Sequence, residues 1–311
     1  MDVAFFDMAE RREKLKVVHK SQKIHTSHSL AGFEPMDLRN AMEHEPQPPV
    51  FVFPGLEAGE VGIFSGPRGM GKTMLALHAA VTLAGGRDLL GFAKLGVMWR
   101  PTPQRVVYLA GEDSDAGLGR RINAIGTCLE PCVRNTVAEH LTILPVLGGR
   151  LNVRDDRCLG DIIEFCTGAS LVVLDPLSRF HNLNEYKRTD MNRLFSVLEC
   201  VAAKSGAAVM CLCHTAEEYD DNRILLRNVR RRAEIDHGRP SERSSDKDRA
   251  GFFVCLHAWG PGCMAFYQWY ERNAEGVLMP LGKNRTEVLF PTLHLGHTGS
   301  EPESIGKEDC G

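Results

Sequence analysis

The segment that most constrains the fold is the string Gly66-Pro67-Arg68-Gly69-Met70-Gly71-Lys72-Thr73. It follows an apolar run at residues 61–65, which is typical of a buried strand, and precedes residues 72–84, where apolar side chains recur at helical spacing. The P-loop pattern GxxxxGK[ST] requires this setting between a strand and a helix, because its glycines turn backbone N–H groups inward at phosphate. The flanking elements disfavour the alternative, a chance glycine-rich turn with a lysine that caps the helix.

Two side chains of this P-loop have predicted roles in holding a nucleotide. Lys72 is expected to reach the β- and γ-phosphate oxygens, and the Thr73 hydroxyl to occupy one coordination position of Mg²⁺. The predicted cofactors are therefore ATP and Mg²⁺. The predicted nucleotide-binding residues are Gly66, Pro67, Arg68, Gly69, Met70, Gly71, Lys72 and Thr73.

Strand and helix patterns alternate through the middle of the chain. Apolar runs rich in β-branched residues recur at residues 105–110, 141–145, 171–175 and 207–213. Between these runs, apolar residues lie three and four positions apart at residues 116–128, 159–166 and 191–204. The order predicts an α/β fold, a mostly parallel sheet flanked by helices on both faces. Later runs predict antiparallel strands at one edge of that sheet, at residues 252–259, 264–270 and 276–280.

Composition divides the chain into three predicted parts. Residues 1–48 combine basic residues and histidines with little apolar periodicity and end near a proline-rich stretch, so we expect a partly disordered arm and linker. Residues 49–283 form the predicted ATPase domain. Residues 284–311 are rich in Gly, Pro, Ser and charge, and are expected to be a disordered tail.

Charge and hydropathy restrict the classes of function. With 37 Lys and Arg against 40 Asp and Glu, the formal net charge is -3, so any nucleic-acid contact must be local. No apolar stretch reaches the ~18 residues of a membrane-spanning helix and the first residues lack the order of a signal peptide, which favours a cytoplasmic protein without a membrane partner. The 10 cysteines are scattered, so buried free thiols are expected rather than zinc ligands or disulfides.

Polar residues follow three of the predicted strands, at the sheet edge where ligands of open α/β sheets bind. Asp175 is expected to hold a Mg²⁺-bound water, as a Walker B carboxylate does. Glu112 is assigned as the base that polarises the attacking water, with Asp113 as its helper or as a cap of the next helix. His214 is expected to sense the γ-phosphate. Alternatively, the acids only cap helices and the histidine is a hydrogen-bonded structural residue.

Together these motifs resemble a known family. Residues 174–181, Leu-Asp-Pro-Leu-Ser-Arg-Phe-His, are similar to the DPLxRFH signature of the RepA family of plasmid hexameric replicative helicases and their AAA-type relatives. The likeness extends over residues 37–283 and includes residues 84–86, 108–113, 269–272 and 275–278. It implies a RecA-like P-loop ATPase core in a homohexameric ring, with ATP at each interface and single-stranded DNA in the central hole. A replication initiator or primase would be a further partner.

The resemblance also implies roles for single residues. Lys72, Thr73, Glu112, Asp175 and His214 keep the roles given above. The arginine finger of the family lies in an SRGSS-like segment, which residues 241–245 resemble without the glycine, so Arg243 is the candidate finger and a predicted catalytic residue. The chain departs from the family pattern at Cys213, which replaces a second histidine, and in lacking a lysine in the late strand pair.

Basic side chains on two predicted loops are candidates for DNA contacts. The loop after His214 carries five arginines within residues 222–232, and the loop after Asp175 carries further basic residues. In RecA-type rings these loops face the pore, where basic side chains would contact phosphates. An amphipathic helix with a solvated basic face is the alternative for residues 222–232. The predicted DNA-binding residues are Arg179, Lys187, Arg188, Arg223, Arg227, Arg230, Arg231 and Arg232.

Three functional hypotheses follow from these patterns. The first is an ATP-hydrolysing ring motor on single-stranded DNA, a plasmid-type replicative helicase. The second is a DNA-binding recombinase or regulator that uses ATP as a switch and does not unwind DNA. The third is a metabolic kinase that uses the same P-loop, whose ATP turnover would be independent of DNA.

Overall fold

The structure is a computed structural model, which describes residues 35–45, 51–92, 102–149, 151–185, 187–214, 232–238, 253–260 and 263–282. The chain divides into two units, one that ends at Gln47 and one that begins at Pro48. In the first unit, helix α2 (Leu38–Glu43) begins after Asp37, whose side chain accepts a hydrogen bond from the Asn40 N–H. The predicted arm, ATPase domain and tail stay predictions, and the tail lies outside the described residues.

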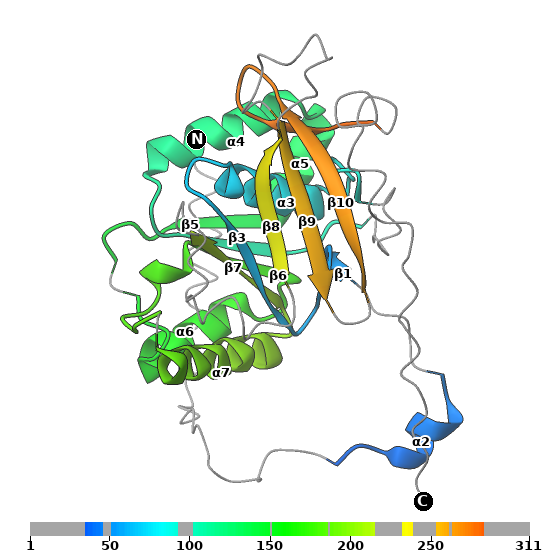
Figure 1. Cartoon of the computed structure of the whole chain (residues 1–311), viewed down its shortest axis with the longest axis vertical. Helices are drawn as coiled ribbons and strands as arrows, with labels where there is room; N and C mark the ends of the chain where they lie inside the picture. The colour runs from blue at the N-terminus through cyan, green and yellow to red at the C-terminus, as the bar shows by residue number, and fades with distance from the viewer. Residues whose placement is uncertain are drawn as a thin grey trace, which may run out of the picture. The chain divides into compact units, whose positions relative to one another are not determined.

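A large mixed sheet forms the centre of the second unit (Figure 1). Among the described residues its strands lie in the order β11-β10-β9-β8-β3-β7-β6-β4-β5. Strands β3 to β8 pair with one another in parallel, whereas the pairs β8–β9, β9–β10 and β10–β11 at one edge are antiparallel. The predicted fold class is therefore confirmed. The strands are β3 (Val61–Gly66), β4 (Val106–Ala110), β5 (Leu141–Pro145), β6 (Leu171–Asp175), β7 (Ala208–His214), β8 (Arg232–Gly238), β9 (Phe253–Gly260), β10 (Cys263–Arg272) and β11 (Leu278–Pro280).

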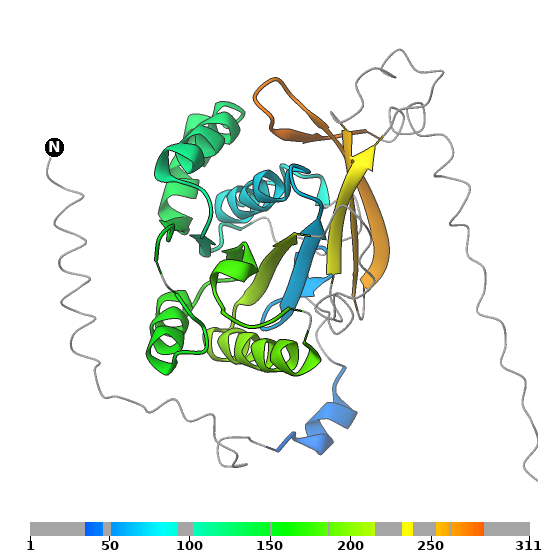
Figure 2. The same ribbon diagram turned by 60° about the vertical axis from the view of Figure 1, so that its left-hand side comes forward.

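Helices cover both faces of this sheet (Figures 1 and 2). One face carries α3 (Lys72–Gly85), α4 (Asp115–Thr127) and α5 (Pro131–His140), and the other carries α6 (Asp156–Cys166) and α7 (Arg188–Ser205). Every residue of α3 except Thr73 is buried, because the helix contacts β4 and β6 on one side and α4, α5 and β11 on others. A helix that is apolar on all sides is stable only in such a setting.

The central strands are buried along their whole length. All residues of β4 and β6 are buried, and so are those of β7 except His214. Strands covered on both faces read as continuous apolar runs, which is why the sequence pattern located them within one or two residues. The expected buried thiols occur at Cys166, Cys211, Cys213 and Cys255, whereas Cys128 and Cys132 are exposed.

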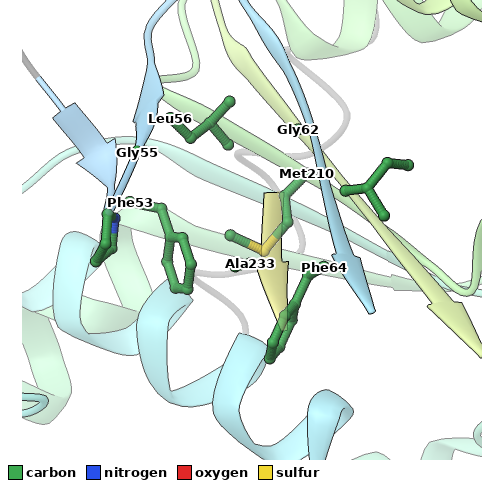
Figure 3. A pocket seen from close by; sticks show the side chains of 9 residues that line it. Phe53, Gly55, Leu56, Gly62, Phe64, Met210 and Ala233 are labelled. Atoms are coloured by element: carbon green, nitrogen blue, oxygen red, sulfur yellow. The ribbon is translucent and has the colours of Figure 1, made fainter. Parts of the chain in front are cut away.

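Several elements were not predicted. The helix α5 is amphipathic with one buried residue, Val133, and its pattern is weak. A short hairpin of β1 (Phe51–Phe53) and β2 (Leu56–Glu57) packs against β3 and β7 of the sheet. Between them lies a small apolar pocket, which is lined by Phe53, Leu56, Phe64 and Met210 (Figure 3). This pocket is lined by apolar side chains and backbone, so it serves packing rather than chemistry.

Strand β8 corrects the prediction for the charged stretch after residue 215. Residues 232–238, Arg-Ala-Glu-Ile-Asp-His-Gly, form a strand in which Ala233 and Ile235 are buried. Arg232 is the first residue of this strand and is paired with Ile63 of β3 and Trp259 of β9, so it does not belong to a loop as expected. The strand escaped recognition because its alternating apolar residues are only two.

None of the described helices is long and apolar enough to cross a membrane.

Candidate nucleotide site

Four strand ends meet at one edge of the sheet. The register pairs Gly66 at the end of β3 with His214 at the end of β7, and Ala110 at the end of β4 with Asp175 at the end of β6. Since β7 and β6 are neighbours, the P-loop, Glu112, Asp175 and His214 lie along the same carboxyl edge. This is the edge at which the strand-end pattern predicted a ligand site.

The P-loop connects β3 to α3. Gly71 adopts a φ of +98° and precedes the first helical residue, a left-handed conformation that favours glycine. The N–H of Leu75 donates to the Gly71 carbonyl, so the first turn of α3 begins at the loop itself. The N-terminus of a helix with unsatisfied N–H groups is thereby aimed at the site, which favours phosphate there.

Lys72 is buried at the centre of the loop, with 4% of its surface exposed. Its ammonium donates to the carbonyl oxygens of Gly66 at 2.6 Å and Pro67 at 2.7 Å. Burial lowers the pKa of Lys72 from 10.5 to about 8, although Asp175 and other acidic groups nearby act in the opposite direction. The lysine is thus held by loop carbonyls, close to where a phosphate would lie.

Asp175 is held by its neighbours on both sides. The hydroxyl of Tyr108, a fully buried residue of β4, donates to Asp175 Oδ2 at 2.5 Å. Burial raises the pKa of Asp175, and hydrogen bonds from Tyr108 and Thr73 lower it in part. Sequence reasoning missed Tyr108, because nothing in one sequence tells which residue of β4 lies opposite Asp175.

Thr73 and Asp175 fit the chemistry of Mg²⁺. The threonine hydroxyl and the carboxylate interact directly, and both offer the oxygen ligands that Mg²⁺ prefers. Within the described ranges, no cluster of three or more His, Cys, Asp or Glu side chains suits a metal ion. The ion would therefore be held by these two residues together with phosphate oxygens and water, as is usual for Mg²⁺ on a nucleotide.

Glu112 lies between two basic side chains. Its Oε2 is 3.4 Å from His214 Nε2, and its Oε1 is 3.6 Å from Arg179 Nη2. Burial, followed by the charge of Lys72, lowers the pKa of His214, and the hydrogen bond with Glu112 raises it in part. The Nδ1 atom of His214 is buried without a hydrogen-bond partner in the part of the chain that the structure describes.

Arg179 reaches Glu112 from the segment that follows β6. It is the last residue of a short 3-10 helix, η2 (Leu177–Arg179). Gly111 leaves room for it, because a Cβ added at Gly111 would lie 2.7 Å from Arg179 Cβ. Arg179, which was predicted to contact DNA, is thus an ion-pair partner of Glu112, a contact that the sequence pattern did not indicate.

The alternative role of Glu112 and Asp113 was to cap the next helix, α4, but another residue occupies the cap position. Ser114 is the N-cap of α4 and accepts from the Gly117 N–H at 3.2 Å, while Asp113 pairs with Arg121 at 3.1 Å. Glu112 therefore does not cap this helix. Its carboxylate faces the site instead.

The remaining predicted basic residues lie at the beginning of α7, in the P-loop or outside the described residues. Lys187 is the N-cap residue of α7 and Arg188 its first residue. Arg223, Arg227, Arg230, Arg231 and Arg243 fall outside the described residues. Arg68 of the P-loop is exposed, and its charge acts on both Lys72 and His214.

The P-loop follows β3, which one strand separates from β6 and its terminal Asp175, and Glu112 follows the next strand, β4. This arrangement defines a P-loop ATPase with a RecA-like core. A family model described as an AAA domain matches residues 29–220, which is more than half of the chain. The chain belongs to this AAA domain family. Among solved structures, the crystal structure of the RadB recombinase matches with a TM-score of 0.47 and 13% sequence identity, over 73% of this chain and 93% of that chain.

Proposed function

We propose that this protein binds ATP with Mg²⁺ at the carboxyl edge of β3, β4, β6 and β7 and hydrolyses it. The observation that supports this most is the meeting of Lys72, Asp175 and Glu112, which come from three separate elements. Lys72 interacts electrostatically with both acids. A lysine cradled by a P-loop, with a carboxylate for the cation and a second one for water, is what phosphoryl transfer to water requires.

Lys72 would change partners when a nucleotide binds. Its ammonium now donates to the carbonyls of Gly66 and Pro67, and these bonds can be exchanged for bonds to phosphate oxygens at little cost in desolvation. The P-loop N–H groups and the N-terminus of α3 would bind the remaining phosphate oxygens. Thr73 and Asp175 would hold Mg²⁺, which supplies positive charge against the charge that develops on the phosphates.

Glu112 would orient the attacking water and accept its proton. The carboxylate is partly exposed and is fixed from two sides by His214 and Arg179. A base held in one orientation contributes to catalysis because the bound water then needs little rearrangement to attack. His214, which contacts Glu112 through its Nε2 atom, would respond to the γ-phosphate through Glu112.

For the cellular role, we propose a ring motor on single-stranded DNA, of the plasmid replicative helicase type. The proposal is supported by the likeness of residues 174–181 to the signature of that family and by the basic residues after His214. Arg243 of one subunit would complete the site of the next in a hexamer, and each hydrolysis step would shift the DNA-binding loops. A replication initiator or primase would load the ring.

The experiment is ATP turnover with and without single-stranded DNA, for the wild type and Lys72→Ala. We expect turnover in the wild type that single-stranded DNA stimulates, and a loss of about 100-fold or more in Lys72→Ala. Absence of wild-type turnover under both conditions would refute the motor. Turnover that ignores DNA would favour a small-molecule kinase.

A tailed duplex then separates the two DNA hypotheses. Strand displacement without filament formation supports the helicase. ATP-dependent filaments on DNA without strand displacement support a recombinase or regulator and contradict the helicase.

A further inference from the structure

Arg272 contacts the P-loop from the opposite end of the chain. It is the last residue of β10 and is paired with Leu278 of β11. Its Nη2 atom donates to the carbonyl of Met70 and, at 3.5 Å, to that of Gly69. Arg272 was not assigned a role from the sequence, although residues 269–272, which include it, resemble part of the same family pattern.

The guanidinium of Arg272 packs closely against the P-loop backbone. A Cβ added at Gly71 would lie 2.8 Å from Arg272 Nη2, so the guanidinium packs directly on the loop backbone. The side chain is half-buried, and burial lowers the pKa of Arg272. A guanidinium removed from water in this way needs strong acceptors, and the two carbonyls supply them.

The element that carries Arg272 is itself held in place. The hydroxyl of buried Tyr270 donates to the Leu90 carbonyl at 3.2 Å. After Arg272, the side chain of Asn273 accepts from the N–H groups of Glu275 and Val277 at 3.1 Å and 2.8 Å, which closes the turn into β11. The guanidinium is therefore presented to the loop by a fixed strand and turn.

The geometry of the peptide group explains how the contact of Arg272 with these carbonyls affects the N–H groups of the loop. The carbonyl of Gly69 and the N–H of Met70 belong to one peptide group, and they point in opposite directions. The same holds for the carbonyl of Met70 and the N–H of Gly71. A cation on the carbonyls therefore orients these two N–H groups away from itself and polarises them as donors.

We propose that Arg272 is a positioning residue for the phosphate-binding loop, which holds the Met70 and Gly71 N–H groups toward bound phosphate. The inference deepens the proposed ATP site and rests on it. Arg272 touches loop carbonyls and not reacting atoms, so it acts on nucleotide affinity and not on the chemical step. In this it differs from Arg243, the candidate finger, which would act on turnover from a neighbouring subunit.

The test compares Arg272→Gln and Arg272→Lys with the wild type, by calorimetric titration with ATP and with ADP, and by turnover. We expect Arg272→Gln to raise both dissociation constants about tenfold, which corresponds to ~1.4 kcal/mol, and to leave kcat within about threefold. Arg272→Lys, which keeps one point-charge donor, should recover part of the affinity. A merely structural residue would not change ATP and ADP affinity equally while sparing kcat.

Arg105 offers a matched control. It also donates from its guanidinium to two backbone carbonyls, those of Thr167 at 2.9 Å and Phe165 at 2.8 Å. These carbonyls lie at the end of α6, on the other face of the sheet from α3. Arg105→Gln should therefore leave both dissociation constants unchanged, and thermal unfolding of all variants checks that they fold.

The outcomes separate the inference from the function on which it rests. Wild-type dissociation constants in Arg272→Gln overturn the inference, and so does a fall in kcat with unchanged affinity. If Arg272→Gln does not fold, unchanged affinity in Arg272→Lys also overturns it, because an ammonium lacks the planar fork and the reach of the guanidinium. If the wild type and Arg105→Gln bind no more nucleotide than Lys72→Ala, the proposed ATP site itself is wrong.

Discussion

At the scale of single residues, the hydroxyl of Tyr108 fixes the orientation of Asp175. In Tyr108→Phe the carboxylate loses this donor and can rotate away from Thr73. We expect the Mg²⁺ concentration for half-maximal turnover to rise by about tenfold, as is usual when a group that orients a metal ligand is removed. Turnover measured against Mg²⁺ concentration checks this.

Ser205→Ala is the control for that prediction. It removes another buried hydroxyl, which donates to the Val201 carbonyl of α7 at 2.6 Å rather than to Asp175. An equal shift in Mg²⁺ dependence for both variants would mean that general loosening, and not the orientation of Asp175, is responsible.

Lys72 makes the stability of the nucleotide-free protein depend on pH. Its pKa is lowered by burial from 10.5 to about 8, so the charged lysine is less favourable in the folded chain than in the unfolded one. Below the folded pKa both states carry the proton and the full penalty applies. Between about 8 and 10.5 the folded state binds fewer protons than the unfolded state, so stability rises with pH.

Comparison with Lys72→Met isolates this effect. Methionine carries no charge, so we expect the variant to be more stable than the wild type at pH 7, with a difference that shrinks as pH rises through that window. Denaturant unfolding at a series of pH values measures it. Parallel stability curves for the two proteins would contradict the prediction.

The residues of the candidate nucleotide site differ in how far a single sequence predicts them. Lys72 and Thr73 belong to a contiguous motif, and Asp175 and Glu112 follow apolar runs, so local pattern is enough to find them. Tyr108 and Arg272 act through contacts with residues 67 and 202 positions away. Such contacts depend on strand order and register, which one sequence does not encode in any local signal.

At the scale of elements, Gly111, the residue after β4, packs against η2. Its N–H donates to the Asp175 carbonyl at 2.7 Å, and Arg179 lies against its Cα. In Gly111→Ala the added methyl group would displace η2 and pull Arg179 from Glu112. We expect kcat to fall between about tenfold and 100-fold, because the orientation of the base is disturbed, while nucleotide affinity changes little.

Gly119→Ala is the control for this substitution. Gly119 lies within α4, and nothing lies within 4 Å of a Cβ added there. Alanine in a helix interior should stabilise the protein by about 0.5–1 kcal/mol and leave kcat unchanged. Wild-type kcat in Gly111→Ala would show that Glu112 does not need Arg179.

Strand prediction succeeded where a strand is a continuous apolar run and failed at β8. The strands β4, β6 and β7 are buried on both faces and give continuous apolar runs. In β8, Ala233 and Ile235 alternate with charged and polar residues inside a longer charged stretch. The position of β8 beside β3 is set by tertiary packing, which a local count of apolar residues cannot detect.

At the scale of the whole molecule, the candidate site is in contact with three segments that lie far apart in the sequence. Arg272 comes from the antiparallel edge, Arg179 from the segment after β6, and His214 from the end of β7. Nucleotide binding can therefore bias several elements at once through direct contacts. A ring motor would need such links, because each subunit must transmit its nucleotide state to DNA and to its neighbour.

Subunit mixing tests whether sites are shared between neighbours. Lys72→Ala lacks a working P-loop and Arg243→Ala lacks the candidate finger, so each variant alone should be inactive. In mixed rings, an interface with the P-loop of one variant and the arginine of the other is complete. With equal random mixing about a quarter of interfaces are complete, so up to about a quarter of wild-type turnover should return.

The matched mixture uses Lys72→Ala with the double variant Lys72→Ala/Arg243→Ala. No intact P-loop is present in it, and it must stay inactive. Activity of the first mixture above that of either component shows that Arg243 acts across an interface. Recovery well below a quarter, with assembly intact, would mean that one incomplete site halts its neighbours, as expected of a motor whose subunits fire in sequence.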